Sequence, residues 1–378
     1  MNFSYDSATH DRLEQTAYTR SAVRNLCVAI IGGGALGSEV ARLLGLLGLG
    51  SVLLIDHDVV EATNLTHSPY LRSANAIGRS KVEVLAEALS QHFPDTRWSK
   101  LSCEIADAGF EHLRNCALLF SCTDNALARV ETCYAAHRLG LPMMDSGLKG
   151  RAFWSGRVTW FPGGPAACYL CQLGEARRAE LLSLSLAASL SCSAPLPDEH
   201  GLPSTPTMAS VVAGLQVDLG LRMLLNTTAD TAEARVWEIS LPLPETTWRS
   251  FTIPRSSDCP WHSHDSSLRF ASLPTDTAID ESLAQLGKSA ETAPPVLELD
   301  WPICVQARCS TCRHLWRPML RLATLRRRAN CPACGGSRLH SVETISTVAT
   351  GDPFAHFTPA ELCLSPCHLF TLRYTLSP

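Results

Sequence analysis

The chain has 378 residues, 46% of them hydrophobic, and a formal net charge of −4 at pH 7. This balance excludes a mainly disordered chain and argues against a generally nucleic-acid-binding surface, and the length suits one large domain and one smaller one. The first residues lack a basic start followed by an apolar core, and the most apolar run, 43–55, is too short to span a membrane. We therefore expect a cytoplasmic location and no membrane partner.

The first strong pattern is a strand, a glycine loop, a helix and a second strand. An apolar run at 26–31 breaks into a loop with glycine at Gly32, Gly34 and Gly37, and the second apolar run ends at Asp56. Gly32 permits a tight turn, Gly34 lets the backbone approach a phosphate, and Gly37 lets the helix pack closely on the strand. The helix start offers N–H groups to phosphate, and Asp56 would accept ribose hydroxyls. The unit predicts a nucleotide site; the alternative is a glycine-rich turn in an α/β core.

Strand and helix patterns alternate as far as Asp145. We expect helices at 79–92 and directly after 122–125, and strands at 98–101, 116–121 and 141–145. This alternation predicts an α/β fold with a doubly wound, Rossmann-like, mostly parallel sheet, in which ligands bind at the carboxyl ends of the strands. Asp56, Asp124 and Asp145 all fall at such ends. The region after Asp56 is long for a connection between a strand and a helix, and long loops are usually functional.

The pattern changes after residue 146. A long late helix is expected at 207–225, and strands are expected at 157–161, 236–241 and 248–253. Residues 175–206 are rich in Leu, Ser, Ala and Pro and predict a mobile segment over the site. The polar, Pro-bearing stretch 265–300 predicts a linker with one helix near 279–286. We therefore expect a main domain, 1–264, a linker, 265–300, a zinc ribbon, 301–340, and a tail, 341–378.

Two Cys-x-x-Cys pairs near the C-terminus are separated by 18 residues. They are Cys309 with Cys312 and Cys331 with Cys334. Four thiolates at this spacing are the signature of a zinc ribbon. The alternative, four reduced cysteines in a core, would rarely keep this spacing. A closed site of this kind is structural, since the metal holds a segment too short for its own core. Between the pairs, 326–328 is a run of three arginines, for which a solvated face is favoured over a patch for nucleic acid or an acidic partner.

Another such pair, Cys168 and Cys171, has no second pair nearby. The best partners are Cys259 and His262, which have the same spacing and follow a strand region. We expect a Cys₃His structural zinc site, with His264 as a substitute for His262. A redox dithiol is the alternative, but no thioredoxin-like context surrounds it.

Polar residues in the predicted loops indicate the kind of nucleotide. Asn64, His67 and Lys81 follow the second strand, and Asp124 ends a later one. A lysine at a helix start is poorly placed for the helix dipole, so Lys81 needs another role, such as binding phosphate. Asp124 could hold Mg²⁺. Each residue alone would more often be a solvated surface group, but together they favour ATP with Mg²⁺ over a redox dinucleotide.

The ordered series of motifs resembles the ubiquitin-activating-enzyme superfamily, which includes the bacterial sulfur-carrier adenylyltransferases of molybdopterin and thiamine synthesis. The resemblance covers about residues 20–264. It rests on Gly32-x-Gly34-x-x-Gly37, Asp56-x-Asp58-x-Val60-Glu61-x-x-Asn64-Leu65, Gly78-x-x-Lys81, Cys122-Thr123-Asp124-Asn125 and Cys168-x-x-Cys171 with the later Cys/His pair.

The resemblance implies a homodimeric enzyme that uses ATP to adenylate the C-terminal carboxylate of a small ubiquitin-like or sulfur-carrier protein, with release of pyrophosphate. By the pattern of the family, Asp56 binds the ribose, Asn64 and Lys81 bind the phosphates, and Asp124 binds Mg²⁺; Asp58 is counted with the nucleotide-binding residues. The chemistry agrees, because cations must neutralise the phosphates before a carboxylate can attack.

The sequence departs from the family at one phosphate-binding position. The family usually continues Asn-Leu-x-Arg-Gln, but His67 stands where the arginine is expected. Neutral histidine is a weaker phosphate partner than guanidinium. Either Arg72 or Arg79 compensates, or the ATP site is altered. The arginine that dimers of the family lend to the partner's site has three candidates: Arg12, Arg20 and Arg24.

A covalent step is also implied, since many members of the family pass the acyl group to a cysteine before the late helix. That segment here holds one cysteine, Cys192, followed by Gly201-Leu-Pro-Ser-Thr-Pro-Thr-Met-Ala209. This order resembles activating enzymes found with bacterial ubiquitin-like proteins. No basic residue adjoins Cys192 to lower its pKa, so a thioester and a free cysteine both remain open. The catalytic candidates are thus Cys192, Lys81 and Asp124.

Three rival functions remain open. A peptide-modifying adenylyltransferase would activate a short peptide instead, and an NAD-dependent oxidoreductase would use the same glycine loop for a nicotinamide cofactor. A non-catalytic scaffold would have kept the fold without activity, an option that His67 sustains. In the favoured function, the ribbon would recognise the ubiquitin-like substrate or a downstream transfer protein.

Overall fold

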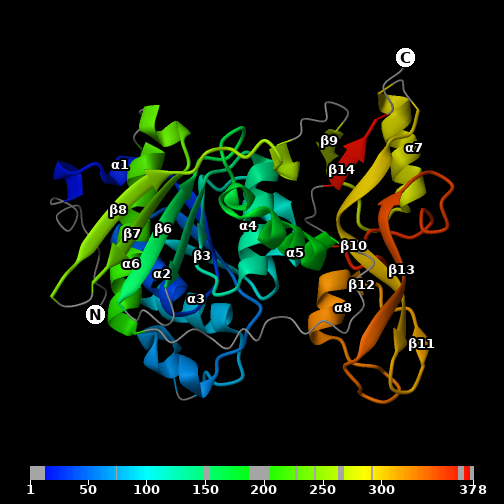
Figure 1. The fold of residues 1–378 in the computed structure, drawn as a ribbon, viewed down its shortest axis with the longest axis horizontal. Helices are drawn as coiled ribbons and strands as arrows, with labels where there is room; N and C mark the ends of the chain where they lie inside the picture. The colour runs from blue at the N-terminus through cyan, green and yellow to red at the C-terminus, as the bar shows by residue number, and fades with distance from the viewer. Residues whose placement is uncertain are drawn as a thin grey trace. The chain divides into compact units, whose positions relative to one another are not determined.

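The computed structural model describes residues 13–73, 75–148, 154–186, 205–225, 229–241, 244–262, 268–290, 293–364 and 370–374. The chain forms two compact units, each described by itself below and coloured by residue number in Figure 1. The described residues of 13–105, 113–173 and 205–262 make up unit 1, and those of 106–112, 174–186 and 268–374 make up unit 2.

Unit 1 is built on an eight-stranded sheet with the order β3-β2-β1-β4-β5-β6-β7-β8 (Figure 1). The first five strands of this order run parallel, and β6, β7 and β8 continue the sheet in antiparallel pairs. The predicted mostly parallel α/β sheet is therefore confirmed. The strands are β1 (Cys27–Ile31), β2 (Ser51–Ile55), β3 (Arg97–Leu101), β4 (Leu118–Ser121), β5 (Met143–Leu148), β6 (Ser155–Phe161), β7 (Arg235–Ser240) and β8 (Thr247–Thr252).

Helices cover both faces of this sheet. Apolar residues of α2 (Ala35–Leu46), α3 (Lys81–His92) and α6 (Pro206–Leu225) share one core with residues of β1, β2, β4 and β6. α4 (Ala126–Leu139) packs on β4 and β5 from the other face. Gly147 of β5 and Gly156 of β6 present opposite faces of the sheet. A Cβ at Gly147 would meet Arg129 of α4, whereas a Cβ at Gly156 would meet Val212 of α6. The layers are those of a doubly wound fold.

α6 is the one helix among the described residues that is long and apolar enough to cross a membrane by composition. Its apolar side chains pack instead against α2, β5 and β6, and Val212, Val217 and Leu221 are fully or almost fully buried. A core helix explains its composition without a membrane.

Short helices complete the described part of unit 1. They are η2 (Leu13–Gln15), α1 (Arg20–Val23), η3 (Ala62–Thr66), η4 (Pro69–Leu71), η7 (Tyr169–Gln172), η8 (Ala229–Ala232) and η9 (Pro260–His262). Near the N-terminus, Tyr18 donates a hydrogen bond to the carboxylate of Asp218 on α6, which fastens this segment to the core.

Unit 2 is organised around the long strand β10 (Val296–Cys309). β10 pairs with four other strands, in the order β11-β10-β14-β9 with β12 and β13 also on β10. The other strands are β9 (Leu268–Ala271), β11 (Leu315–Trp316), β12 (Leu320–Arg321), β13 (Leu339–Val348) and β14 (Phe370–Arg373), and the helices are η5 (Ile105–Asp107), η6 (Phe110–Leu113), α5 (Glu175–Leu186), α7 (Ile279–Ser289) and α8 (Leu322–Arg328).

The predicted linker, 265–300, differs from the structure. Its described residues contain β9, α7 and the start of β10, and Ile279 and Leu283 of α7 are fully buried in the same core as Phe370 of β14. The expected helix is present within α7. The strands could not be predicted from the polar, Pro-bearing composition, because β9 and β14 are short and each pairs with a partner that is distant in sequence. The zinc ribbon is thus one end of a larger unit.

Candidate active site

The glycine loop joins β1 to α2 as predicted. Gly32 has φ +97°, and a Cβ there would lie 2.8 Å from the carbonyl oxygen of Cys122, so a side chain would be strained and crowded. A Cβ at Gly37 would lie 1.8 Å from the carbonyl oxygen of Gly32, which explains why the helix approaches the loop so closely. No described atom lies within 4 Å of a Cβ built on Gly34. This part of the loop is open to a ligand.

Asp56 follows β2 and is bonded to the glycine loop. Its Oδ2 accepts the N–H of Gly33 at 2.6 Å, and its Oδ1 accepts the N–H of Asp58 at 2.8 Å. Burial, and then the charge of Asp58, raise the pKa of Asp56 above its ordinary value, while Lys81 and the two N–H groups oppose this shift. Asp56 therefore holds the loop in place, and its oxygens retain further lone pairs that could accept ribose hydroxyls.

Lys81 begins α3 and lies among carboxylates. Its Nζ is 2.9 Å from Oδ2 of Asp58, and its side chain is 11% exposed. Burial acts to lower the pKa of Lys81, but the charges of Asp56, Asp58 and Asp124 and the hydrogen bond to Asp58 together outweigh burial, and the net pKa is raised. Lys81 therefore stays charged at neutral pH. Asp58 orients this ammonium, and an incoming phosphate would compete with Asp58 for it.

Asp124 lies in the loop between β4 and α4, at the same edge of the sheet. It is exposed, and it interacts electrostatically with Lys81. The next residue, Asn125, caps α4 by accepting the N–H of Ala128 at 2.7 Å, so the helix start next to Asp124 is well defined. The structure thus brings Asp56, Lys81 and Asp124 to one edge of the sheet, beside the glycine loop.

Two of the predicted phosphate ligands, Asn64 and His67, contact backbone groups of their own loop after β2. Asn64 closes a capping box in η3, where its Oδ1 accepts the N–H of Glu61 at 2.9 Å. The Nδ1 of His67 lies 3.0 Å from the carbonyl oxygen of Thr63. For Asn64 the amide nitrogen remains as the possible phosphate donor. The sequence did not reveal these local bonds.

The two expected substitutes for the missing arginine differ in environment. Arg79 forms a surface ion pair with Glu87 at 2.6 Å. Arg72 follows η4 and is exposed. Compensation for His67 therefore remains a prediction, with Arg72 the better candidate.

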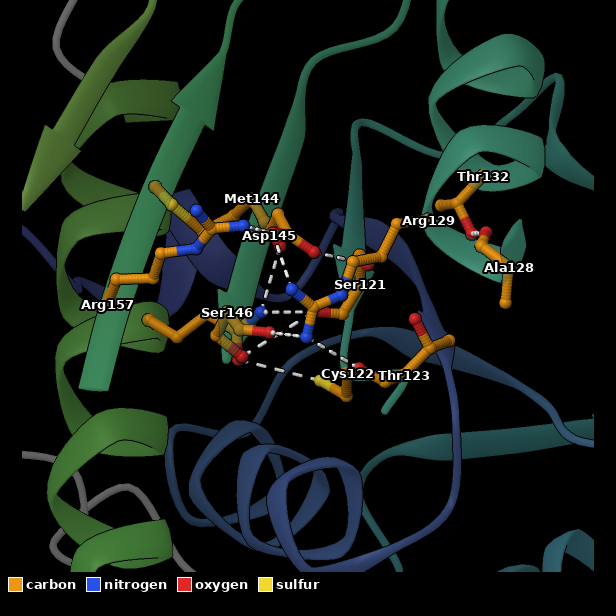
Figure 2. Close-up of polar contacts among 11 residues, drawn as sticks. Ser121, Cys122, Thr123, Ala128, Arg129, Thr132, Met144, Asp145, Ser146 and Arg157 are labelled. Atoms are coloured by element: carbon orange, nitrogen blue, oxygen red, sulfur yellow. Dashed lines mark hydrogen bonds and ion pairs between the residues drawn. The ribbon is translucent and has the colours of Figure 1, made fainter. Parts of the chain in front are cut away.

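Sequence reasoning missed a charged cluster next to Asp124. Arg129 on α4 has a side chain that is 13% exposed, and its guanidinium lies 3.6 Å from the fully buried carboxylate of Asp145 (Figure 2). Arg157 on β6 lies 3.9 Å from the same carboxylate. The helical spacing of Arg129 could have indicated that it faces the protein interior. It precedes the buried Cys133 and Ala136 of α4 by four and seven residues and therefore shares their face.

The four predicted metal ligands of unit 1 come together. The Sγ atoms of Cys168 and Cys259 are 3.5 Å apart, and Sγ of Cys171 is 3.2 Å from Nε2 of His262. All four ligand atoms lie within 4.8 Å of one another. A tetrahedral zinc ion with Zn–S bonds of about 2.3 Å holds sulfurs ~3.8 Å apart. The donor set and its spacing therefore fit a structural zinc ion.

The four predicted ribbon ligands form a second such group in unit 2. The Sγ atoms of Cys309 and Cys334 are 3.6 Å apart, as are those of Cys312 and Cys331, and all four lie within 4.8 Å of one another. Four thiolates at this spacing fit a zinc ion as well. The side chains of 326–328 lie outside the described residues.

Several predictions fall outside the described residues. They concern Cys192, the alternative ligand His264, and Arg12. Of the other candidate arginines, Arg20 begins α1 and Arg24 follows it. The residue lent to a partner's site therefore remains a prediction.

Taken together, the mostly parallel sheet and the helices on its two faces define a doubly wound α/β protein with a glycine loop and polar residues at the strand ends. The chain matches the ThiF family over residues 13–261. Because this is more than half of its length, the chain belongs to the ThiF family, a family of enzymes.

Two relatives indicate where within this family the similarity lies. Ubiquitin-like modifier-activating enzyme 5 of Drosophila virilis is 30% identical over 217 residues, covering 54% of this chain and 51% of that protein. The protein of the same name from Gallus gallus is 31% identical, covering 54% and 52%. The chain therefore spans about half the length of the curated relatives it matches.

Solved structures share the fold. MccB of E. coli, crystallised with ATP, aligns with a TM-score of 0.51 and 20% identity, covering 69% of this chain and 75% of that one. The complex of E. coli MccB with MccA-N7isoASN aligns with a TM-score of 0.52 and 18% identity, covering 70% and 77%.

Proposed function

We propose that the protein uses ATP to adenylate the C-terminal carboxylate of a small ubiquitin-like or sulfur-carrier protein. The observation that carries the proposal is the convergence of the open glycine loop with Asp56, Lys81 and Asp124 at one sheet edge. The names of the relatives support the class of substrate, since they are ubiquitin-like modifier-activating enzymes.

The proposed reaction joins two negatively charged partners. A carboxylate oxygen of the carrier attacks the α-phosphorus of ATP, the bond to pyrophosphate breaks, and an acyl-adenylate forms. Lys81 would offset charge on the phosphates, and backbone N–H groups at the start of α2 would bind them as well. Asp56 would hold the ribose. These groups thus hold the two reactants in line and reduce their repulsion.

Mg²⁺ would, when bound, neutralise further charge on the phosphates. The residue suited to hold it is Asp124, because its exposed carboxylate offers the oxygen ligands that Mg²⁺ prefers. The metal-binding groups of the two units would hold structural zinc. We also propose a homodimer in the cytoplasm.

The competing function is an NAD-dependent oxidoreductase. It would use the glycine loop and Asp56 in the same way. It offers no role for a charged lysine held among three carboxylates, which suits a polyphosphate and its metal ion. A nicotinamide cofactor that changes absorbance on incubation with the protein, without release of pyrophosphate, would favour this alternative.

Product analysis tests the adenylation proposal. The full chain would be incubated with ATP, Mg²⁺ and candidate carriers that end in glycine, and the intact mass of each carrier would be measured. The expected result is one carrier whose mass rises by one adenylyl group, that is, by AMP minus one water. Loss of this product in Lys81→Ala, by ~10²–10³-fold in initial rate, would support the role of the ammonium. No adduct on any carrier or short peptide, with ATP bound normally, would favour a scaffold.

Cys192 is proposed as the acceptor of the activated acyl group. The test is the full chain with carrier and ATP, separated under non-reducing conditions. We expect an enzyme–carrier adduct that thiol reagents release and that Cys192→Ala abolishes. An adduct that persists in this variant would exclude Cys192 as the thioester site.

We propose that the ribbon binds the carrier or a downstream transfer protein. Because β9 and α7 share a core with β10, the ribbon is better tested by substitution than by deletion. Cys312→Ser with Cys334→Ser should weaken binding of the partner and spare binding of ATP. Unchanged affinity for both would contradict this role.

A further inference from the structure

The largely buried guanidinium of Arg129 is bonded to the loop after β4 at Thr123, the residue before Asp124 (Figure 2). One terminal nitrogen of Arg129 donates to the carbonyl oxygen of Thr123 at 2.8 Å and to that of Ser146 at 3.0 Å. The other lies 3.6 Å from Oδ2 of the fully buried Asp145. A single side chain of α4 therefore joins the loop after β4 to β5.

Asp145 keeps Arg129 in this position. Ser121 donates a hydrogen bond to Oδ1 of Asp145 at 2.7 Å, whereas Oδ2 accepts none from any residue in the described ranges. Oδ2 faces the guanidinium groups of Arg129 and Arg157. A buried carboxylate is costly unless it is paired. Arg129 therefore cannot turn away without leaving a buried charge poorly compensated.

The space for this guanidinium depends on Gly147. A Cβ at Gly147 would lie 2.9 Å from one terminal nitrogen of Arg129 and 3.1 Å from the other. Alanine at this position must displace the guanidinium, while both charges remain in the protein. The loop after β4, which holds Cys122 and Thr123, also packs tightly on the glycine loop. A Cβ at Gly32 would lie 2.8 Å from the carbonyl oxygen of Cys122.

We propose that Arg129 is a positioning residue for Asp124 and acts through the carbonyl group of Thr123. This inference rests on the proposed function, in which Asp124 holds Mg²⁺. The carbonyl of Thr123 shares one planar peptide unit with the N–H of Asp124, so the bond to Arg129 orients the backbone that carries the carboxylate. Tyr169, which follows the metal ligand Cys168, interacts with the same guanidinium and extends this support to the metal-binding turn of unit 1.

The test is a Mg²⁺ titration of ATP–pyrophosphate exchange with the full chain, comparing the wild type with Gly147→Ala and Arg129→Lys. Lysine keeps a charge beside Asp145 but lacks the planar fork that reaches the carboxylate and both carbonyls. Misplacement of a group by about 1 Å costs on the order of 10²-fold. A smaller shift predicts roughly a tenfold rise in the half-saturating Mg²⁺ concentration for both variants. KM for ATP at saturating Mg²⁺ should stay unchanged.

Gly214→Ala is the matched control, because a Cβ there would meet nothing within 4 Å apart from the backbone of its own helix turn. It should keep the Mg²⁺ dependence of the wild type. The melting temperature of each variant is measured in parallel. If Arg129 served only the fold, its variants would lose stability and exchange rate together while the Mg²⁺ dependence stayed that of the wild type. That result would overturn the proposal.

Binding of ATP in the presence of Mn²⁺, measured without a carrier, separates this inference from the proposed function. A wild type that binds ATP in a Mn²⁺-dependent way but shows no exchange would contradict adenylation alone. A roughly tenfold weaker Mn²⁺ dependence in Gly147→Ala would then still support the positioning role. Equal Mn²⁺ dependence in the two proteins, or none in the wild type, would refute it.

Discussion

Asp56 serves both the fold and the proposed ligand site. It is 8% exposed, and its two oxygens accept backbone N–H groups from two different loops. A carboxylate can accept both bonds, whereas an amide offers one oxygen and a donor group. The identity of this residue therefore matters for stability as well as for binding.

Asp56→Asn should lower the free energy of unfolding by about 1–3 kcal/mol, because one buried N–H group loses its acceptor. It should also weaken ATP binding. Urea unfolding and calorimetric titration with ATP measure the two effects. A variant with the stability and the ATP affinity of the wild type would contradict the assignment.

The pKa of Asp56 gives opposite pH trends for stability and for binding. Its folded-state pKa is raised, first by burial, so the folded chain holds the proton more tightly than the unfolded chain does. Its contribution to stability is fully present below the unfolded pKa of about 4 and is lost as pH rises through the folded value. The stability of the wild type relative to Asp56→Asn should therefore fall over this pH range, while its ATP affinity rises as the carboxylate forms. Parallel trends would contradict this account.

Among individual residues, the sequence allowed prediction of those whose roles follow from their type and their order in the chain. Spacing identified the glycines, Asp56 and Lys81, and the structure brings them together at the sheet edge. It could not reveal that Arg79 pairs with Glu87, because that contact depends on side-chain conformation at the surface. Nor could it identify the partner of Arg129, which lies on another element.

Among the elements, the contact between α2 and the glycine loop depends on a missing side chain. A Cβ at Gly37 would lie 1.8 Å from the carbonyl oxygen of Gly32, so either the helix or the loop must move. Gly37→Ala should therefore lower the free energy of unfolding by about 1–3 kcal/mol or more, as measured by urea unfolding.

Gly214→Ala is again the control, since its Cβ would be in open space on α6. It should stabilise the protein by about 0.5–1 kcal/mol, as expected for alanine within a helix. If the two variants unfold alike, close packing of the loop does not determine the stability of this element.

The two metal-binding turns of the ribbon share a left-handed residue after the second cysteine. Arg313 has φ 60° and Gly335 has φ 71°, and their N–H groups donate to the carbonyls of Cys309 and Cys331. Arginine pays about 1 kcal/mol or more for this conformation, and glycine does not. Arg313→Gly should therefore raise the free energy of unfolding of the zinc-loaded protein by about 0.5–1 kcal/mol.

Gly335→Ala is the reciprocal variant, because no described atom lies within 4 Å of its Cβ and only backbone conformation changes. It should destabilise the protein by about 1 kcal/mol. Denaturant unfolding at saturating Zn²⁺ measures both. Shifts of the same sign in the two variants would be inconsistent with equivalent turns.

The elements of unit 1 could be predicted because strand and helix periodicity alternates along the chain. The predicted late helix, 207–225, coincides with α6 within one residue. The strands of unit 2 could not be predicted as a sheet. β9 pairs with β14 about 100 residues later, and no local pattern encodes such a pairing.

For the whole molecule, the two metal-binding groups lie in separate compact units and differ in exposure. In unit 1, Cys168, Cys259 and His262 are buried, whereas Cys312 and Cys334 of the ribbon are exposed. Access controls the rate at which a chelator or a thiol reagent removes a structural metal. The two sites should therefore release zinc at different rates.

We expect two equivalents of zinc per chain, one released fast and one slowly when a thiol-blocking reagent and a chromogenic chelator are added. Cys312→Ser should abolish the fast phase, and Cys259→Ser the slow one. Metal analysis of each variant provides the control. A single phase that both variants reduce equally would contradict independent sites.

We propose above all that this site activates a carboxylate with ATP. The most direct measurement is exchange of labelled pyrophosphate into ATP by the full chain, with Mg²⁺ and a panel of carriers that end in glycine. We predict exchange that requires one such carrier and falls by ~10²–10³-fold in Asp124→Ala. Exchange that survives this substitution at the wild-type rate would contradict the role of Asp124. A wild type that binds ATP and carrier together yet catalyses no exchange would contradict adenylation itself.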